Sequence, residues 1–302
     1  MSGFALALHG GAGALRPGRF AADEEAAIRR ALAECLEEAR AALAAGAAAL
    51  DAVERAVTRL EDDPRFNAGR GSVLTSEGCV EMDASLMDGR TRAAGAVACV
   101  TRVANPIAAA RLVMERTPHV LLVGEAADRF ALAHGVREAA PGSLVTPARA
   151  EELARLREGR AAREAGGTVG AVARDARGHL AAATSTGGMA GQLPGRAGDS
   201  AAIGAGTWAD DATCAVSGTG HGEAFVRCAL AHEVDALVRL RGLPLAAACD
   251  AALARVAALG SRGGCIAVGR EGGPVLRFDT EGMLRAWLDD TGRPRVALYA
   301  GE

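Results

Sequence analysis

Residues 167–188 read GTVGAVARDARGHLAAATSTGG, and this stretch decides how the rest of the chain is interpreted. Two apolar runs, over 168–173 and 180–184, flank the turn-forming residues 175–178. This pattern predicts a β-hairpin, which would bring the hydroxyl of Thr186 back beside that of Thr168. Taken alone, Gly167-Thr168 is an ordinary strand start.

The composition limits which group can activate a hydroxyl nucleophile. All 34 basic residues are Arg, which excludes Schiff-base lysines, phosphate-loop lysines and Ser-Lys hydrolases. The remaining bases are a His, a carboxylate or a free α-amino group, whose pKa of about 8 suits neutral pH. Thr168 gains a free amine only if its bond to Gly167 is cut. A glycine before the bond permits the strained backbone that such a cut requires.

Size and charge narrow the class of protein. The 302 residues are 50% hydrophobic and 24% charged, which is typical of a soluble globular protein. A net charge of -3 favours a small neutral or zwitterionic substrate over nucleic acid or a membrane. The seven scattered cysteines indicate buried thiols in a reducing compartment. Without a basic leader or a membrane-length apolar run, we expect a cytoplasmic protein.

The first glycine-rich segment follows an apolar strand at 4–8. It reads His9-Gly10-Gly11-Ala12-Gly13 and predicts a tight turn. A dinucleotide fingerprint is excluded because Arg16 occupies the position of the third glycine. An esterase oxyanion loop lacks the Gly-x-Ser-x-Gly elbow that it requires. A structural turn beside an active site is the favoured interpretation.

Elsewhere, periodicity and turn residues predict alternating groups of strands and helices. Because strands cluster before helices in both halves, we expect two stacked sheets with helices outside. The segment 141–166 is rich in Pro, Arg, Glu, Ala and Gly and predicts an exposed, mobile linker that ends at a processing site. The predicted helices are 21–45, 47–60, 106–115, one that ends at His134, 224–241 and one after Pro244. The predicted strands include 79–87, 93–100, 120–123, 212–216, 265–268 and 275–278.

Three further groups of residues are suited to substrate binding, to stabilising an oxyanion or to binding an ion. Arg196 and Asp199 match the carboxylate and ammonium of an amino acid, although a surface pair is the simpler interpretation. Thr219-Gly220-x-Gly222 precedes a helix and is a candidate oxyanion hole. The loop 60–71 carries three consecutive acids, so it suits a divalent ion through carboxylates or a monovalent ion through backbone carbonyls.

Several motifs occur in an order that resembles one family. The chain is similar to plant-type L-asparaginases/isoaspartyl peptidases (beta-aspartyl-peptidases) of the N-terminal-nucleophile hydrolase superfamily, nearly from end to end. The motifs are His9-Gly-Gly-Ala-Gly13, Phe66-Asn-Ala-Gly-x-Gly71, Met82-Asp83-Ala84, Gly167-Thr-Val-Gly170, Thr184-Ser-Thr-Gly-Gly188, Gly195-Arg-x-Gly-Asp-Ser200 and Thr219-Gly-x-Gly-Glu223.

The resemblance implies an α+β fold, a four-layer αββα sandwich of the N-terminal-nucleophile hydrolase type. It implies one domain, 1–302, that cleaves itself between Gly167 and Thr168 into chains 1–167, with a mobile linker at about 141–167, and 168–302. These would assemble as a homodimer of αβ units. The expected activity is release of L-aspartate from L-asparagine and from β-aspartyl dipeptides, with no organic cofactor.

The resemblance also implies site roles by motif position. Thr168 is the nucleophile, and Thr186 hydrogen-bonds to it. Thr219 and Gly220 form the oxyanion hole. Substrate is bound by Arg196, Asp199, Gly220, Gly222 and Asn67. A structural Na⁺ is held by backbone carbonyls of Leu60, Glu61, Asp63, Phe66, Ala68 and Arg70. Alternatives are a glycosylasparaginase-like amidase and an uncleaved, non-catalytic scaffold.

Overall fold

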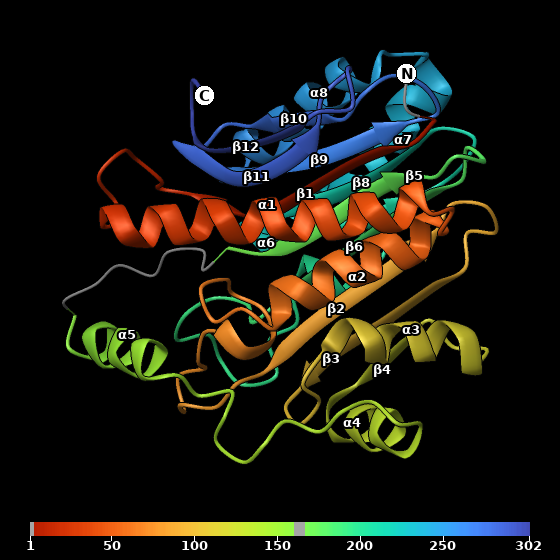
Figure 1. Ribbon diagram of the computed structural model, residues 1–302. Coiled ribbons are helices and arrows are strands. Elements are labelled where there is room, and N and C mark those ends of the chain that lie inside the picture. The colour runs from red at the N-terminus through yellow and green to blue at the C-terminus, as the bar shows by residue number, and fades with distance from the viewer. Residues whose placement is uncertain (1–2, 160–166) are drawn as a thin grey trace.

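The computed structural model describes residues 3–159 and 167–302 and contains two β-sheets packed against each other (Figure 1). The larger sheet contains β1 (Ala5–Gly13), β2 (Met82–Asp88), β3 (Ala94–Val100), β4 (Leu121–Val123), β5 (Val169–Arg174), β6 (Leu180–Thr186), β11 (Gly282–Leu288) and β12 (Pro294–Tyr299). The smaller sheet contains β7 (Thr207–Ala209), β8 (Cys214–Gly220), β9 (Gly263–Gly269) and β10 (Val275–Phe278). The strand orders are β12-β11-β1-β5-β6-β2-β3-β4 and β10-β9-β8-β7.

Helices cover the outer face of each sheet. On the larger sheet, α1 (Ala22–Ala44) packs on β1 and β12, α2 (Ala49–Glu61) on β5 and β6, and α3 (Pro106–Arg116) on β2 and β3. On the smaller sheet, α7 (Leu230–Arg241) packs on β8, and α8 (Leu245–Ala258) on β9 and β10. Figure 1 shows α1 and α2 lying across the central strands of the larger sheet. The layers therefore run helices, sheet, sheet, helices.

The two faces of the larger sheet contribute to two different parts of the core. On β1, Leu6 and Leu8 join the core beneath the helices, whereas Ala5 and Ala7 face the smaller sheet. Because alternate residues of a strand face opposite sides, β5 divides in the same way. Alanine occurs on both faces of the sheet, which lets the layers on either side approach closely. This accounts for a large core with only 3% aromatic residues.

The structure confirms the two predicted hairpins. In one, β2 pairs antiparallel with β3, and in the other β5 pairs antiparallel with β6. The predicted break between the first two helices is also confirmed, because α1 ends before Gly46, whose φ is +91°. The helix after Asn105, the strand β4 and the helix α4 (Gly124–Ala133) likewise lie where the sequence predicts them.

The turn predicted at 9–13 is wrong. The strand β1 continues through these residues to Gly13 and pairs on one side with β5 and on the other with β11. A β-bulge lies between His9 and Gly11, and Gly11 has φ +114°. The glycines therefore serve a bulge inside a central strand rather than a chain reversal.

The predicted linker requires a correction as well. Residues 147–157 form a helix, α5 (Pro147–Arg157), with Thr146 as its N-cap and Pro147 in its first turn. The Thr146 hydroxyl accepts a hydrogen bond from Arg149 N, so local capping overrides the linker-like composition. Residues 160–166 of this segment lie outside the described residues.

Two other expectations change near the C-terminus. The helix predicted over 224–241 is two helices, α6 (Gly222–Cys228) and α7, separated by Ala229 with φ +47°. The strands β7, β11 and β12 were not predicted, and β11 pairs with β1. Within the described residues, no helix has the length and apolarity needed to cross a membrane.

Candidate active site

The hairpin brings Thr168 and Thr186 together on the face that meets the smaller sheet. In the register of β5 and β6, Val169 pairs with Ser185 and Gly170 with Thr184. Thr168 and Thr186 therefore lie opposite each other at the end of the pair. The Thr168 hydroxyl donates to the Thr186 hydroxyl at 3.3 Å, and both side chains are buried.

The carbonyl of Gly167 has two hydrogen-bond donors. Asn67 Nδ2 donates to Gly167 O at 2.8 Å, and Thr186 Oγ1 donates to the same oxygen at 3.2 Å. Asn67 is itself fixed, because its Oδ1 accepts from Val73 N and its Nδ2 also donates to Gly188 O. These donors would stabilise negative charge that develops on this carbonyl oxygen.

Backbone packing around the bond depends on glycine. Gly167 has φ +81°, in the left-handed region that disfavours other residues. A Cβ on Gly11 would lie 2.8 Å from the Cα of Gly167. The bulge in β1 thus allows the two segments to touch beside the Gly167-Thr168 bond.

His9 contacts the candidate nucleophile from the neighbouring strand and was missing from the predicted site. Its Nδ1 lies 2.8 Å from the Thr168 carbonyl oxygen, which can only accept, so Nδ1 carries the proton. Its Nε2 then accepts from Ser217 Oγ at 3.0 Å. Burial lowers the pKa of His9 to about 4, so the ring is neutral.

A line of buried hydroxyls extends from His9 between the sheets. Ser217 Oγ lies 2.8 Å from Thr184 Oγ1, which lies 2.6 Å from Thr207 Oγ1, and Ser85 Oγ lies 2.8 Å from Thr207 Oγ1. A Cβ on Gly170 would lie 2.0 Å from Ser217 Oγ, so the second glycine of the motif keeps this line intact. The line holds the carbonyl of Thr168 in place.

Arg196 and Asp199, which were predicted to bind the carboxylate and the ammonium of an amino acid, have side chains that approach the same position. We call this pair the clamp. A Cβ on Gly222 would lie 2.7 Å from both Arg196 Nη2 and Asp199 Oδ1. The missing side chain at Gly222 therefore keeps open a space bounded by a cation and a carboxyl group. Asp199 Oδ2 is buried without a hydrogen-bond partner among the described residues. Burial raises the pKa of Asp199 to about 7, although the Arg196 charge acts to lower it.

Two acids of the first half hold the clamp loop. Glu81 accepts from Gly195 N at 2.7 Å, and Asp83 accepts from Gly198 N at 2.8 Å. Asp83 is buried, which raises its pKa to about 6. These two hydrogen bonds position the loop and join the two halves of the chain.

Thr219 and Gly220 end β8 beside the β1 bulge. Thr219 Oγ1 accepts from Ala12 N at 3.2 Å, and within the described residues its hydroxyl donates to no protein group. Gly220 has φ +157°, and a Cβ there would lie 2.8 Å from Arg262 O. This end of β8 therefore offers two polar groups near β1: the hydroxyl of Thr219 and the backbone of Gly220, which has no side chain.

Comparisons with known proteins show which family and which proteins this chain is similar to. Residues 2–298 match the asparaginase family (Asparaginase_2). The chain belongs to the asparaginase family. It is 48% identical over 312 residues to an isoaspartyl peptidase of Salmonella typhimurium, covering 97% of this chain and 98% of that protein. It is 45% identical over 306 residues to an isoaspartyl peptidase of Escherichia coli, covering 97% and 95%. It is 41% identical over 294 residues to a human isoaspartyl peptidase/L-asparaginase, covering 94% and 93%.

In this asparaginase-family chain, the loop after α2 folds back on itself through two glycines. A Cβ on Gly71 would lie 2.0 Å from Phe66 O and 2.7 Å from Pro64 O. Gly69 has φ +53°, and a Cβ there would lie 2.4 Å from Glu61 O. Backbone carbonyls thus crowd toward the short 3₁₀ turn Gly69–Gly71.

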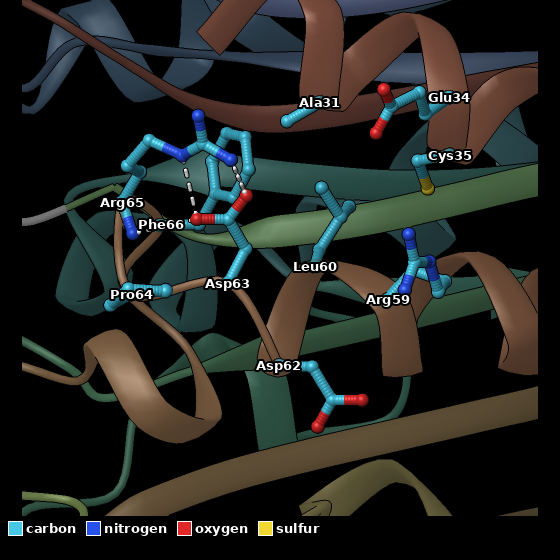
Figure 2. Close-up of a pocket in the computed structure, with 10 residues that line it drawn as sticks. All are labelled: Ala31, Glu34, Cys35, Arg59, Leu60, Asp62, Asp63, Pro64, Arg65 and Phe66. Atoms are coloured by element: carbon cyan, nitrogen blue, oxygen red, sulfur yellow. Dashed lines mark hydrogen bonds and ion pairs between the residues drawn. The ribbon is translucent and has the colours of Figure 1, made fainter. Parts of the chain in front are cut away.

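The acidic side chains of this loop contact other protein groups. Figure 2 shows the Asp63 carboxylate facing the guanidinium of Arg65, with Asp62 pointing away from both. Glu61 is buried and accepts from Ser185 Oγ at 2.7 Å, and burial raises its pKa to about 8. Within the described residues, no group of three or more His, Cys, Asp or Glu side chains is arranged to hold a metal ion. A cation in this loop would depend on carbonyl oxygens.

Proposed function

We propose that this chain is a threonine amidohydrolase that releases L-aspartate from L-asparagine and from β-aspartyl dipeptides. The observation that carries the proposal is the buried Thr168 hydroxyl, 3.3 Å from Thr186, beside a glycyl carbonyl held by Asn67. The names of the relatives, isoaspartyl peptidase and isoaspartyl peptidase/L-asparaginase, support the same chemistry.

Activation would proceed by self-cleavage at the Gly167-Thr168 bond. Thr168 Oγ bonds to the Gly167 carbonyl carbon, and Asn67 and Thr186 stabilise the oxyanion. The carbon–nitrogen bond then breaks, and the hydroxyl proton ends on the departing nitrogen. Water hydrolyses the resulting ester, leaving a Gly167 carboxylate and a free amine on Thr168.

The mature enzyme would use that amine as its base. Thr168 Oγ attacks the β-carbonyl of asparagine, and the amine accepts the hydroxyl proton. Thr219 and Gly220 stabilise the tetrahedral oxyanion. The amine returns its proton to the leaving nitrogen, which releases ammonia and forms a β-aspartyl ester. Water, deprotonated by the same amine, then releases aspartate.

The clamp would select aspartyl substrates. The guanidinium of Arg196 suits the α-carboxylate, and ionised Asp199 suits the α-ammonium. Because Gly222 leaves the space between them open, the backbone of the substrate would fit there. Asn67 would serve both self-cleavage and substrate binding.

We further propose the larger-scale features expected of this family. The order of layers supports a four-layer αββα sandwich of the N-terminal-nucleophile type, formed by one domain cut into chains 1–167 and 168–302. Two such αβ units would form a homodimer that acts in the cytoplasm without an organic cofactor.

The loop 60–70 would hold a structural Na⁺ through its backbone carbonyls. The crowding of carbonyls at Gly69 and Gly71, together with the diversion of the acidic side chains, fits a monovalent ion better than a divalent one. Replacing Na⁺ with choline should lower the midpoint temperature of thermal unfolding.

Product release tests the proposed function. Purified enzyme should release ammonia and aspartate from asparagine, and aspartate from a β-aspartyl dipeptide, whereas Thr168→Ala should release neither. Turnover of a glycan-linked asparagine in preference to both would favour the glycosylasparaginase alternative. Release by Thr168→Ala at the wild-type rate would exclude Thr168 as the nucleophile.

A further inference from the structure

A cavity of about 620 Å³ opens on the Gly167 side of the cleavage bond. Its inner wall includes Gly11, Ala12, Asn67 and Gly167. Two of these residues connect it to the reaction centre, because Asn67 donates to Gly167 O and Ala12 N donates to Thr219 Oγ1. The cavity therefore borders the scissile bond at Gly167, and Ala12 separates it from the candidate oxyanion hole.

The proposed mechanism determines where a leaving group must lie. The proton reaches the leaving nitrogen from the amine of Thr168, so the two nitrogens must approach to hydrogen-bond distance. In the uncut chain, the atom bonded to that amine nitrogen is the carbonyl carbon of Gly167. The leaving nitrogen therefore lies on the Gly167 side of Thr168, where this cavity opens.

The outer wall suits an amino-acid residue. Its apolar part is formed by Leu15, Phe20, Pro147 and Leu284. Its charged part contains three arginines and two glutamates: Arg19, Arg65, Arg149, Glu24 and Glu152. The wall thus combines an apolar surface with an excess of guanidinium groups. The volume lies within the range of about 300–1,000 Å³ that small-molecule sites occupy.

Arg149 is better placed for a carboxylate than Arg65 is. Arg65 donates Nε and Nη2 to the two carboxylate oxygens of Asp63, so two nitrogens of that guanidinium are already engaged by an acid. Arg149 instead donates Nε to the backbone carbonyl of Gly71 and Nη1 to Glu152, both at 2.8 Å. Among the described residues, its Nη2 has no hydrogen-bond partner, and this nitrogen is available to a ligand.

We propose that this cavity binds the leaving residue of a β-aspartyl peptide, with the α-carboxylate of that residue at Arg149 and its side chain against Phe20. The inference rests on the proposed function and adds a substrate preference to it. Peptides whose leaving residue is apolar and carries a free carboxylate are the favoured class. Asparagine, whose leaving group is ammonia, does not reach the outer wall.

Three substrates test the proposal: β-Asp-Leu, its C-terminal amide, and asparagine. For the wild-type enzyme we expect kcat/KM to be about ten-fold higher for β-Asp-Leu than for the amide, the size of one charge-assisted hydrogen bond. Arg149→Gln should abolish this preference and leave asparagine hydrolysis unchanged. Arg157→Gln is the matched control, because Arg157 lies on the same helix and donates to Ser76 O. It should keep the wild-type preference.

A second variant addresses the apolar wall independently. Phe20→Ala should reduce the ratio of kcat/KM for β-Asp-Leu over β-Asp-Gly without changing asparagine hydrolysis.

Equal rates for β-Asp-Leu and its amide in the wild-type enzyme would overturn the inference while asparagine hydrolysis still supports the proposed function. An equal loss on all three substrates in Arg149→Gln would show a purely structural role at Gly71. Absence of hydrolysis of any substrate by the wild-type enzyme would overturn the proposed function and this inference with it.

Discussion

Thr168 and Thr186 lie opposite each other on neighbouring strands, and their hydroxyls are 3.3 Å apart. Thr186 Oγ1 also accepts from Gly188 N at 3.0 Å and donates to Gly167 O at 3.2 Å. One hydroxyl therefore contacts both the candidate nucleophile and the bond that it would cut. The hairpin that creates this contact is the central element of the proposed site.

Thr186→Val should slow self-cleavage by about 100-fold, because it removes one of two donors to the Gly167 carbonyl while preserving the shape of the side chain. The appearance of the two chains on a denaturing gel over time measures this rate. Thr58→Val, on α2, is the control and should cleave at the wild-type rate. Unchanged cleavage in Thr186→Val would remove Thr186 from the mechanism.

Gly170→Ala should destabilise the protein by about 1–3 kcal/mol through overpacking. The new Cβ would lie 2.0 Å from Ser217 Oγ and 2.6 Å from His9 Nε2. Urea unfolding in the uncut Thr168→Ala background measures the free energy as a single chain. At Gly13, no atom of the described residues other than its chain neighbours lies within 4 Å of a new Cβ, so Gly13→Ala should change stability by less than about 0.5 kcal/mol. Equal stability of the two variants would contradict the packing at Gly170.

Gly222→Ala should raise the KM for asparagine about ten-fold or more, because the methyl group would enter the space between Arg196 and Asp199. Self-cleavage should continue, since the clamp does not contact the Gly167 carbonyl in the described hydrogen bonds. Steady-state kinetics on the cleaved variant separates the two effects. A normal KM in a fully cleaved Gly222→Ala enzyme would place the substrate elsewhere.

The ionisation of Asp199 predicts a pH-dependent stability. Burial raises its pKa from 3.8 to about 7, so the folded state holds a proton that the unfolded state releases above pH 3.8. The stabilisation from this proton is complete below about pH 4 and is lost as pH rises through 7. In the Thr168→Ala background, Asp199→Asn should therefore gain stability relative to its parent between pH 4 and pH 8. Urea unfolding across this range checks the trend. A relative loss with rising pH would show that Arg196 outweighs burial.

The parts of the site that lie close together in sequence were predictable. Thr168 and Thr186 belong to one hairpin, and the alternation of its strands places both on one face. The pairing of Gly222 with the clamp was available only through the resemblance to a family.

Contacts between segments that lie far apart in the sequence could not be predicted from local sequence patterns. His9 reaches Ser217 across the two sheets, and Glu81 reaches Gly195 from the other half of the chain. Nothing in the local pattern around His9 specifies a partner more than two hundred positions away. The glycines near it favoured a turn because a bulge inside a strand uses the same residue type.

Helix α5 was not predicted, although the local sequence does contain a signal for it. Its composition resembles a linker, yet Thr146 and Pro147 form a helix start that was present in the sequence. The composition of a segment is averaged over many residues, whereas a cap acts at one position. The start of this helix is therefore encoded by Thr146 and Pro147, and the composition of the segment does not reveal it.

The central claim is that Thr168 becomes an N-terminal nucleophile. Intact mass and N-terminal sequencing of the purified, incubated protein, followed by an asparagine assay on the same sample, test it most directly. We expect two chains, the second beginning at Thr168, and ammonia release that grows with the cleaved fraction. A single full-length chain that releases ammonia from asparagine would contradict it.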